Sequence, residues 1–160
     1  MFRRVADDPR LRLVVAGDGP DRPVLTALAK QNDLDDRIIF LGEIAHPEEV
    51  LPSFDIFALS SDTEQIPNAI LEAMAAGLPV VAVDVGDVRM MVAPENQPFV
   101  VPRDDLDSFA AAARQLVNDA GLRRHLGIRN RHQVTSFFRQ ELMFSQYEEL
   151  FLKFRSKNIQ

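Results

Sequence analysis

The hydrophobic residues of this chain fall into short runs separated by longer segments with helical periodicity. The runs are apolar at consecutive positions, which is typical of parallel strands covered on both faces. The expected strands lie at residues 11–16, 37–41, 55–59, 78–83 and 99–101. The pattern therefore predicts strands that alternate with helices.

The segments between these strands carry apolar residues at helical spacing and end at turn residues. Pro47 suits the first turn of one helix, and Gly77 suits the end of another. The expected helices cover residues 1–6 (the end of a helix), 21–31, 47–54, 67–76, 85–93, 106–118, 121–137 and 141–155. Helical spacing of the late aromatic residues predicts that they pack a helix onto the body and do not form a ligand-binding surface, which is the alternative. These residues are Phe137, Phe138, Phe144, Tyr147, Phe151 and Phe154.

Alternating strands and helices predict an α/β fold, a Rossmann-like doubly wound parallel sheet with C-terminal helices. We expect a single domain over residues 1–160, with its core at about 11–119 and a helical part at 120–160. Such sheets bind ligands beyond the carboxyl ends of their strands. The loops at those ends are residues 17–20, 42–47, 60–67 and 84–88.

Composition narrows the range of possible functions. A length of 160 residues, 46% hydrophobic content and 26% charged residues are ordinary for one soluble domain. A net charge of −6 argues against a nucleic-acid surface, which needs a basic footprint. Without cysteine there are no disulfides or thiolate metal sites. The apolar runs are too short to span a bilayer and no signal core follows the first residues, so we expect a cytoplasmic protein.

One basic cluster allows two interpretations. The late arginines of this cluster are Arg123, Arg124, Arg129 and Arg131. A solvated helix face is the plainer interpretation. The alternative is contact with an acidic membrane surface or with a partner domain, which would place the protein peripherally at the inner face of the membrane.

The segment EQIPNAILEAMAAGLPVVAVD, residues 64–84, carries the most specific chemistry. Glu64 and Glu72 lie eight positions apart, with the start of a helix between them. A helix N-terminus offers free N–H groups and partial positive charge, which suits a pyrophosphate. Glu72 could bind a ribose diol, and Glu64 a sugar hydroxyl. Spacing alone still favours the plainer interpretation, in which Glu72 complements the helix dipole and Glu64 is solvated.

Two weaker features lie in the other loops. Gly17-Asp18-Gly19-Pro20 could approach a phosphate with its backbone, or it could be a plain turn between a strand and a helix. It lacks both the longer dinucleotide fingerprint and the Gly-Lys-Ser/Thr ending of a P-loop. His46 lies in a carboxyl-end loop, but no histidine has a partner at metal-ligand spacing, so we predict no metal.

In order along residues 11–119, the chain resembles the C-terminal, donor-binding domain of a retaining GT-B glycosyltransferase of family four. LRLVVAGDGP, DRIIFLGEI and SFDIFALSSDTE resemble successive strands and turns of that domain. EQIPNAILEAMAAGLPVVAVDVGD resembles its Glu-x7-Glu region, which is the most specific part of the match. The resemblance implies the C-terminal half of a GT-B fold with its first strand missing.

The resemblance also implies a function. It implies transfer of a hexosyl group from a nucleotide diphosphate sugar with retention of configuration, and neither a metal nor another cofactor. Glu64 would be the catalytic residue and hold hydroxyls of the donor sugar, while Glu72 would hold the ribose. Backbone amides around residues 66–68 would face the sugar and diphosphate, and the strand end at 39–42 would border the base. The donor-binding residues expected beside the two glutamates are Gly17, Gly19, Ile39, Gly42, Ile66, Pro67 and Asn68.

Three departures from the family pattern limit that reading. Gln65-Ile66 stands where the family has Gly-Phe, and Gly86-Asp87-Val88-Arg89-Met90 lacks the glutamate of its Gly-Gly-x-x-Glu stretch. The 160 residues do not match the family's basic diphosphate clamp or its N-terminal domain, and we expect both to be missing. We therefore expect the chain to bind a nucleotide sugar weakly or not at all and to be inactive alone. Its partners would be the missing N-terminal domain and a sugar or lipid-linked acceptor.

Two other classes compete with this interpretation. A non-enzymatic module could pair with a separate N-terminal half or serve as an interaction domain, because a missing edge strand would leave apolar surface needing cover. A phospho-receiver domain also has an alternating sheet. It is disfavoured because no lysine follows a late strand. The lysines are Lys30, Lys153 and Lys157.

Overall fold

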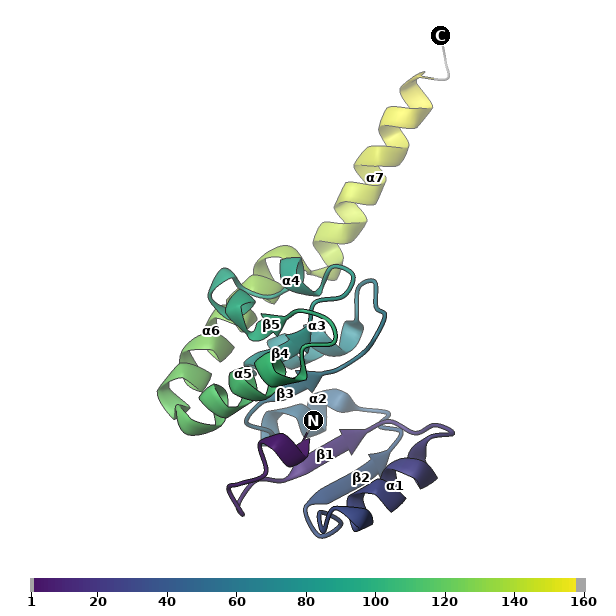
Figure 1. The fold of residues 1–160 in the computed structure, drawn as a ribbon. Coiled ribbons are helices and arrows are strands. Elements are labelled where there is room, and N and C mark those ends of the chain that lie inside the picture. Colours follow the sequence, from purple (N-terminus) through teal and green to yellow (C-terminus); the bar gives the residue numbers. More distant parts are fainter. Residues whose placement is uncertain (1, 158–160) are drawn as a thin grey trace.

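The computed structural model describes residues 2–157, and it forms parallel strands flanked by helices (Figure 1). The strands are β1 (Leu13–Ala16), β2 (Ile38–Gly42), β3 (Phe57–Leu59), β4 (Val80–Val83) and β5 (Val100–Val101). The helices are α1 (Arg22–Gln31), α2 (Pro47–Val50), α3 (Asn68–Ala75), α4 (Val88–Met91), α5 (Leu106–Asn118), α6 (Ala120–Phe137) and α7 (Gln140–Lys157). The short 3-10 helices are η1 (Phe2–Arg4), η2 (Leu51–Ser53) and η3 (Pro94–Phe99). The predicted order of strands and helices is therefore confirmed for the described residues.

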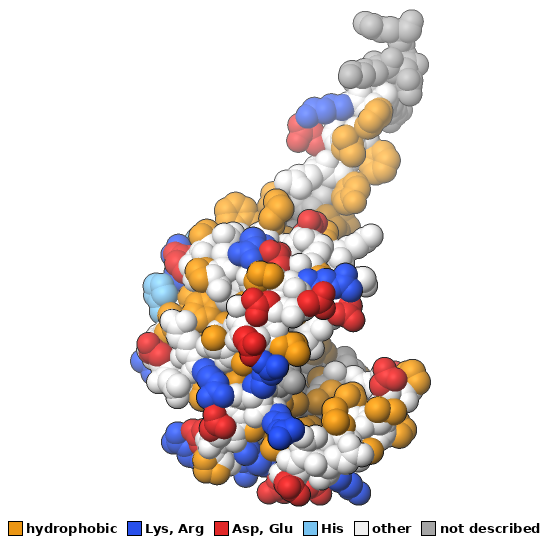
Figure 2. All heavy atoms as spheres, in the orientation of Figure 1, with side chains coloured by type: hydrophobic (Ala, Val, Ile, Leu, Met, Phe, Trp, Pro, Cys, Tyr) orange, Lys and Arg blue, Asp and Glu red, His pale blue; other side chains and the backbone are white. Residues whose placement is uncertain are grey.

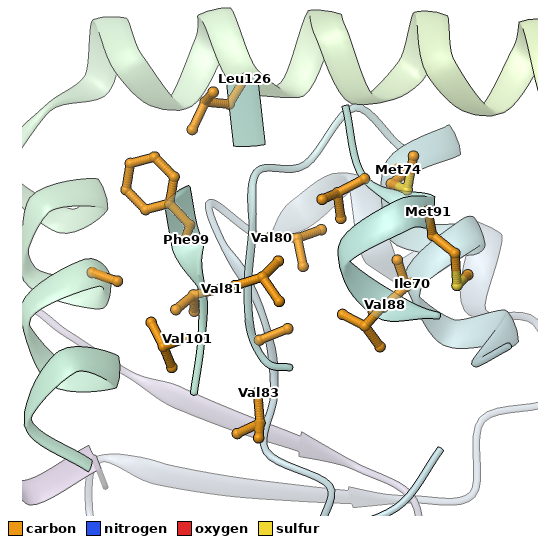
Figure 3. Close-up of a cluster of buried hydrophobic side chains, with 14 of the residues drawn as sticks. Ile70, Met74, Val80, Val81, Val83, Val88, Met91, Phe99, Val101 and Leu126 are labelled. Carbon is orange, nitrogen blue, oxygen red and sulfur yellow. The ribbon is translucent and has the colours of Figure 1, made fainter. Parts of the chain in front are cut away.

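The core surrounds β4, which is buried along its whole length. Helices α3 and α5 both contact this strand, and α6 packs against α3. Figure 3 shows Val80 and Val81 of β4 among side chains from α3, α4 and α6. A strand that is apolar on both faces needs cover on both faces, which these helices provide.

Two buried asparagines hold the start of β4. Asn96 accepts a hydrogen bond from the Val80 amide at 3.0 Å and donates to the Val80 carbonyl at 2.7 Å. Its side chain thus takes the place of a strand partner where β5 is too short to reach. Asn130 of α6 donates to the Leu78 carbonyl and to Asn96 Oδ1, both at 2.9 Å, and accepts from the Ala93 amide at 3.1 Å. This network links α6, η3 and β4.

The strands form two sheets, whereas the sequence predicted one. In the described part of the chain, β1 pairs with β2, and β3 and β5 pair with β4, all in parallel. No ladder joins β1 to β3. A doubly wound sheet has the order 3-2-1-4-5-6, so β2-β1 and β3-β4-β5 match it with the first strand left out. The opening therefore lies in the middle of the sheet and not at its edge.

Residues along this opening are less buried than residues of a central parallel strand usually are. Ala16 of β1 and Ala58 of β3 are exposed, while all four residues of β4 are buried. Figure 2 shows hydrophobic side chains along the notch between the lobe with β1 and β2 and the rest of the molecule. The difference in burial is what two strands facing an unfilled position would show.

The N-terminal segment bridges the two sheets. Arg37 donates to the carbonyls of Ala6 and Asp8 at 2.8 and 2.6 Å, which fixes the segment against β2. From the other side, Arg114 of α5 pairs with Asp7 at 2.6 Å, and Asp107 pairs with Arg4. These contacts orient the β1–β2 lobe without a shared ladder.

The C-terminal helix differs from the prediction. Helix α7 extends away from the body (Figure 1), and its aromatic residues do not pack on the core. Phe144, Tyr147 and Phe151 are 57%, 54% and 69% exposed. Helical spacing correctly predicted an apolar face here, but the body offers that face no surface. No helix within residues 2–157 combines the length and apolarity needed to cross a bilayer.

Candidate functional site

The loop after β3 carries Glu64 to the start of α3. Glu64 is partly buried, while Gln65 and Ile66 are exposed. Pro67 is buried in an extended conformation and precedes the first helical residue, Asn68. No side chain caps this helix N-terminus, so its first N–H groups and their partial positive charge face the loop.

Glu72 lies on the outer face of the same helix. Ile70, Ala73 and Met74 turn into the core, and Asn68 and Glu72 are exposed. Because these two residues are four positions apart, they share one face and are separated by about 6 Å along the axis. The structure therefore places a carboxylate on either side of an uncapped helix N-terminus, with Glu64 before it and Glu72 after it.

The loop after β4 packs against the loop that carries Glu64. The Asp87 amide donates to the Gln65 carbonyl at 3.0 Å, and Gly86 lies against the backbone of Glu64. Arg89, which follows this loop in α4, bonds to Asp84 at 2.6 Å. The sequence marked Gly86–Met90 as a departure from the family pattern and gave no sign of these contacts.

A third group of predicted residues lies at the carboxyl ends of β1 and β2. The Gly17 amide donates to the Gly42 carbonyl at 2.7 Å, and both glycines have positive φ, 117° and 75°. Gly19 follows in the same turn. Ile39 is the second residue of β2 and lies three positions before its carboxyl end. Glycine is suited to both positive-φ positions because it has no Cβ.

Charged side chains that sequence reasoning missed surround this turn. A shallow hollow of about 280 Å³ is lined by Gly17, Asp18, Arg22 and Phe40 among others. Arg22 pairs with Asp18 at 2.6 Å and lies 5.9 Å from the centre of the Phe40 ring. The Gly19 amide and the Arg22 guanidinium hold the pKa of Asp18 below its usual value. The hollow thus combines an apolar wall with a paired cation.

The remaining candidates have ordinary partners. His46 precedes α2 and its Nδ1 lies 3.2 Å from Glu48. In the basic cluster, Arg129 pairs with Glu95 at 2.7 Å and Arg123 with Asp55 at 3.7 Å, while Arg124 and Arg131 are exposed. Within residues 2–157, no group of three or more His, Asp or Glu side chains could hold a metal ion.

Comparison with known proteins places the fold and the site loops in a family. A family model described as "Glycosyl transferases group 1" matches residues 1–119. The chain is 31% identical over 150 residues to N-acetyl-alpha-D-glucosaminyl L-malate synthase of Bacillus anthracis, covering 94% of this chain and 39% of that protein. The chain spans less than half the length of the curated relatives it matches.

Solved structures show the same fold. The C-terminal domain of the glycosyl transferase group 1 family protein LpcC from Francisella tularensis matches with a TM-score of 0.73 and 26% identity, over 87% of this chain and 78% of that chain. HepE from Anabaena, solved in complex with UDP-glucose, matches with a TM-score of 0.85 and 20% identity, over 94% of this chain and 43% of that chain. The similarity to HepE is evidence for the fold alone. The chain belongs to the glycosyl transferases group 1, and its fold is that of the C-terminal domain of the GT-B enzymes in this family.

Proposed function

We propose that this chain is the donor-binding part of an enzyme that transfers a hexosyl group from a nucleotide diphosphate sugar. The observation that carries the proposal is the uncapped N-terminus of α3 between Glu64 and Glu72. A diphosphate fits the free N–H groups, and each carboxylate can accept hydrogen bonds from hydroxyls. The UDP-glucose bound to HepE, a protein of the same fold, is a donor of this chemical class.

Each predicted residue has a role in this proposal. Glu64 holds hydroxyls of the donor sugar, and Glu72 holds the ribose. The backbone at residues 66–68 faces the sugar and diphosphate, Gly17 and Gly19 approach the donor through their backbone, and the end of β2 from Ile39 to Gly42 borders the base. The helix N-terminus then stabilises the negative charge that grows on the diphosphate as it leaves.

The reaction we propose retains the anomeric configuration. The bond between the anomeric carbon and the diphosphate oxygen breaks, and the acceptor oxygen bonds to the same face of the sugar. The acceptor proton passes to the departing diphosphate. Few protein groups need to react in such a step, so the protein contributes mainly by positioning and by electrostatic stabilisation.

We further propose that transfer needs polypeptide beyond these 160 residues. The opening between β1 and β3 and the partial coverage of the relatives both support this. The acceptor, a sugar or a lipid-linked sugar, would bind to that further part. The competing proposal, a non-enzymatic module that pairs with a separate N-terminal half, draws on the same opening. Sugar transfer restored by mixing the chain with a separately expressed N-terminal half would support pairing and show that the pair is an enzyme.

Calorimetry of the chain with UDP-, GDP- and ADP-sugars tests the fragment proposal. We expect weak or undetectable binding, and micromolar affinity or transfer by the chain alone would contradict it. In the longer enzyme, Glu72→Gln tests the ribose role. Loss of a charge-assisted hydrogen bond should raise the donor Michaelis constant by about 10- to 100-fold. Glu141→Gln, an exposed glutamate on α7, is the matched control, and an unchanged constant in Glu72→Gln would count against the role.

A further inference from the structure

We propose that residues 84–89, here called the β4–α4 segment, set the position of Glu64, and that Gly86 and Arg89 are positioning residues for the donor sugar. This inference rests on the proposed role of Glu64. Residues 60–66, which carry Glu64, form neither helix nor strand. The conformation of such a loop depends on what it packs against.

Gly86 makes the closest of these contacts. A Cβ built on Gly86 would lie 2.3 Å from the carbonyl oxygen of Glu64 and 2.7 Å from that of Gln65. Only a residue without a side chain can lie against the loop at this distance. The adjacent Asp87 amide adds a hydrogen bond of 3.0 Å to the Gln65 carbonyl. The backbone from the Glu64 carbonyl to the Gln65 carbonyl is therefore in contact with the β4–α4 segment.

Arg89 fixes the β4–α4 segment to the sheet. Its Nε donates to Asp84 Oδ2 at 2.6 Å, and its two terminal nitrogens donate to the Gln97 carbonyl at 3.1 Å and to the Val100 carbonyl at 2.5 Å. These charge-assisted bonds join the end of β4 to the start of β5. Arg89 thus ties the segment to the sheet, and Gly86, within the same segment, contacts the Glu64 carbonyl.

The positive φ of Gly86 is not the only reason why this position needs a glycine. Gly86 has a φ of 54°, and Gly77 at the end of α3 has a φ of 80°. A Cβ on Gly77 would meet its nearest atom, the Gly127 carbonyl oxygen, at 4.0 Å, which is an ordinary contact, so the Cβ itself causes no collision there. Asparagine adopts positive φ more readily than other residues with a Cβ. Gly86→Asn and Gly77→Asn therefore both place a residue with a Cβ at positive φ. Only Gly86→Asn brings that Cβ into collision with the loop that carries Glu64.

Hydrogen–deuterium exchange of the Asp87 amide, which donates to the Gln65 carbonyl, tests the contact in the 160-residue chain. Gly86→Asn should speed exchange at this amide about tenfold or more, while Gly77→Asn should leave it unchanged. Arg89→Met should also speed exchange, with Arg89→Lys restoring part of the protection. Exchange unchanged in both Gly86→Asn and Arg89→Met overturns the proposal.

A matched ion pair controls for general loss of stability. Arg129 and Glu95 are 2.7 Å apart and 44% and 35% exposed, close to the 41% and 33% of Arg89 and Asp84. Arg129→Met should therefore leave exchange of the Asp87 amide unchanged. Equal acceleration in Arg89→Met and Arg129→Met would mean that the effect is global and would overturn the proposal.

Kinetics of the longer enzyme separate this inference from the proposed function. Gly86→Asn should raise the donor Michaelis constant about tenfold and leave that of the acceptor unchanged, since only the loop bearing Glu64 shifts. If Glu64→Gln raises the donor constant and Gly86→Asn does not, the positioning role is wrong. If neither variant changes it, the role of Glu64 itself is wrong.

Discussion

Replacement of Asn130 should destabilise this domain more than any exposed polar substitution. Asn130 is fully buried, and its amide makes three hydrogen bonds, to Leu78, Asn96 and Ala93. Asn130→Ala leaves the Ala93 amide and the Leu78 carbonyl without these partners inside the core. Each buried unpaired group costs about 1–3 kcal/mol, and the vacated volume adds to that.

Together these effects predict a loss of about 3–5 kcal/mol in the free energy of unfolding. For a chain of this size, that corresponds to a fall of roughly 6–20 °C in the melting temperature. Urea denaturation followed by circular dichroism gives the first quantity directly. The slope with urea should not change, because the native surface is the same.

Two further variants sharpen this experiment. Asn118→Ala removes an exposed asparagine at the end of α5 and should change stability by less than about 0.5 kcal/mol. Asn130→Asp keeps the acceptor for Ala93 but places a carboxylate beside the Leu78 carbonyl and Asn96 Oδ1, so it should be at least as harmful as alanine. A loss below about 1 kcal/mol in Asn130→Ala would refute the reasoning, because the orphaned groups would then have found other partners.

Two further experiments test features outside the core. The hydroxyl and amide of Ser108 hold the pKa of Asp105 below its usual value, so this carboxylate stabilises the fold above that value and ceases to do so as the pH falls through its lowered pKa. Asp105→Ala should lower the melting temperature at neutral pH, and the difference should shrink below about pH 4; a constant difference in thermal melts would contradict this. Phe144→Ser with Phe151→Ser should change the free energy of unfolding by less than about 0.5 kcal/mol each, since both rings are mostly exposed. A loss above about 2 kcal/mol for either in urea denaturation would mean that α7 packs on the body.

Local patterns predicted the elements well where the decisive interactions are local. Helix α5 begins and ends where expected, because Asp105 caps it through the Ser108 amide and the apolar spacing continues to its last turn. The strand expected from residue 78 begins only at Val80. The Leu78 amide instead bonds to the Ala73 carbonyl and closes the end of α3, and Pro79 has no N–H to offer a ladder.

Interactions between segments far apart in the sequence could not be predicted from local patterns. Helical spacing predicted the apolar face of α7 but not whether anything covers it, since spacing describes one helix alone. Gly86 lies 22 positions after Glu64, and their contact depends on two irregular loops. Arg89 falls at a position that the family pattern leaves open, and its three partners lie just after β4, in η3 and in β5.

The split sheet bears directly on the candidate site. In the order 3-2-1-4-5-6 the chain reverses direction across the sheet between the first and fourth strands, and ligands bind at that point beyond the carboxyl ends. Here β3 takes the fourth position, so the reversal falls at the opening beside β3. The loop with Glu64 follows β3, and the turn with Gly17 follows β1 on the other side of the opening. A parallel strand between β1 and β3 would end between the Gly17 turn and the Glu64 loop. The resemblance places the basic residues that clamp a diphosphate on such a strand. The same opening therefore supports both parts of the proposed function: a donor site beside this opening, and the dependence of tight donor binding on further polypeptide.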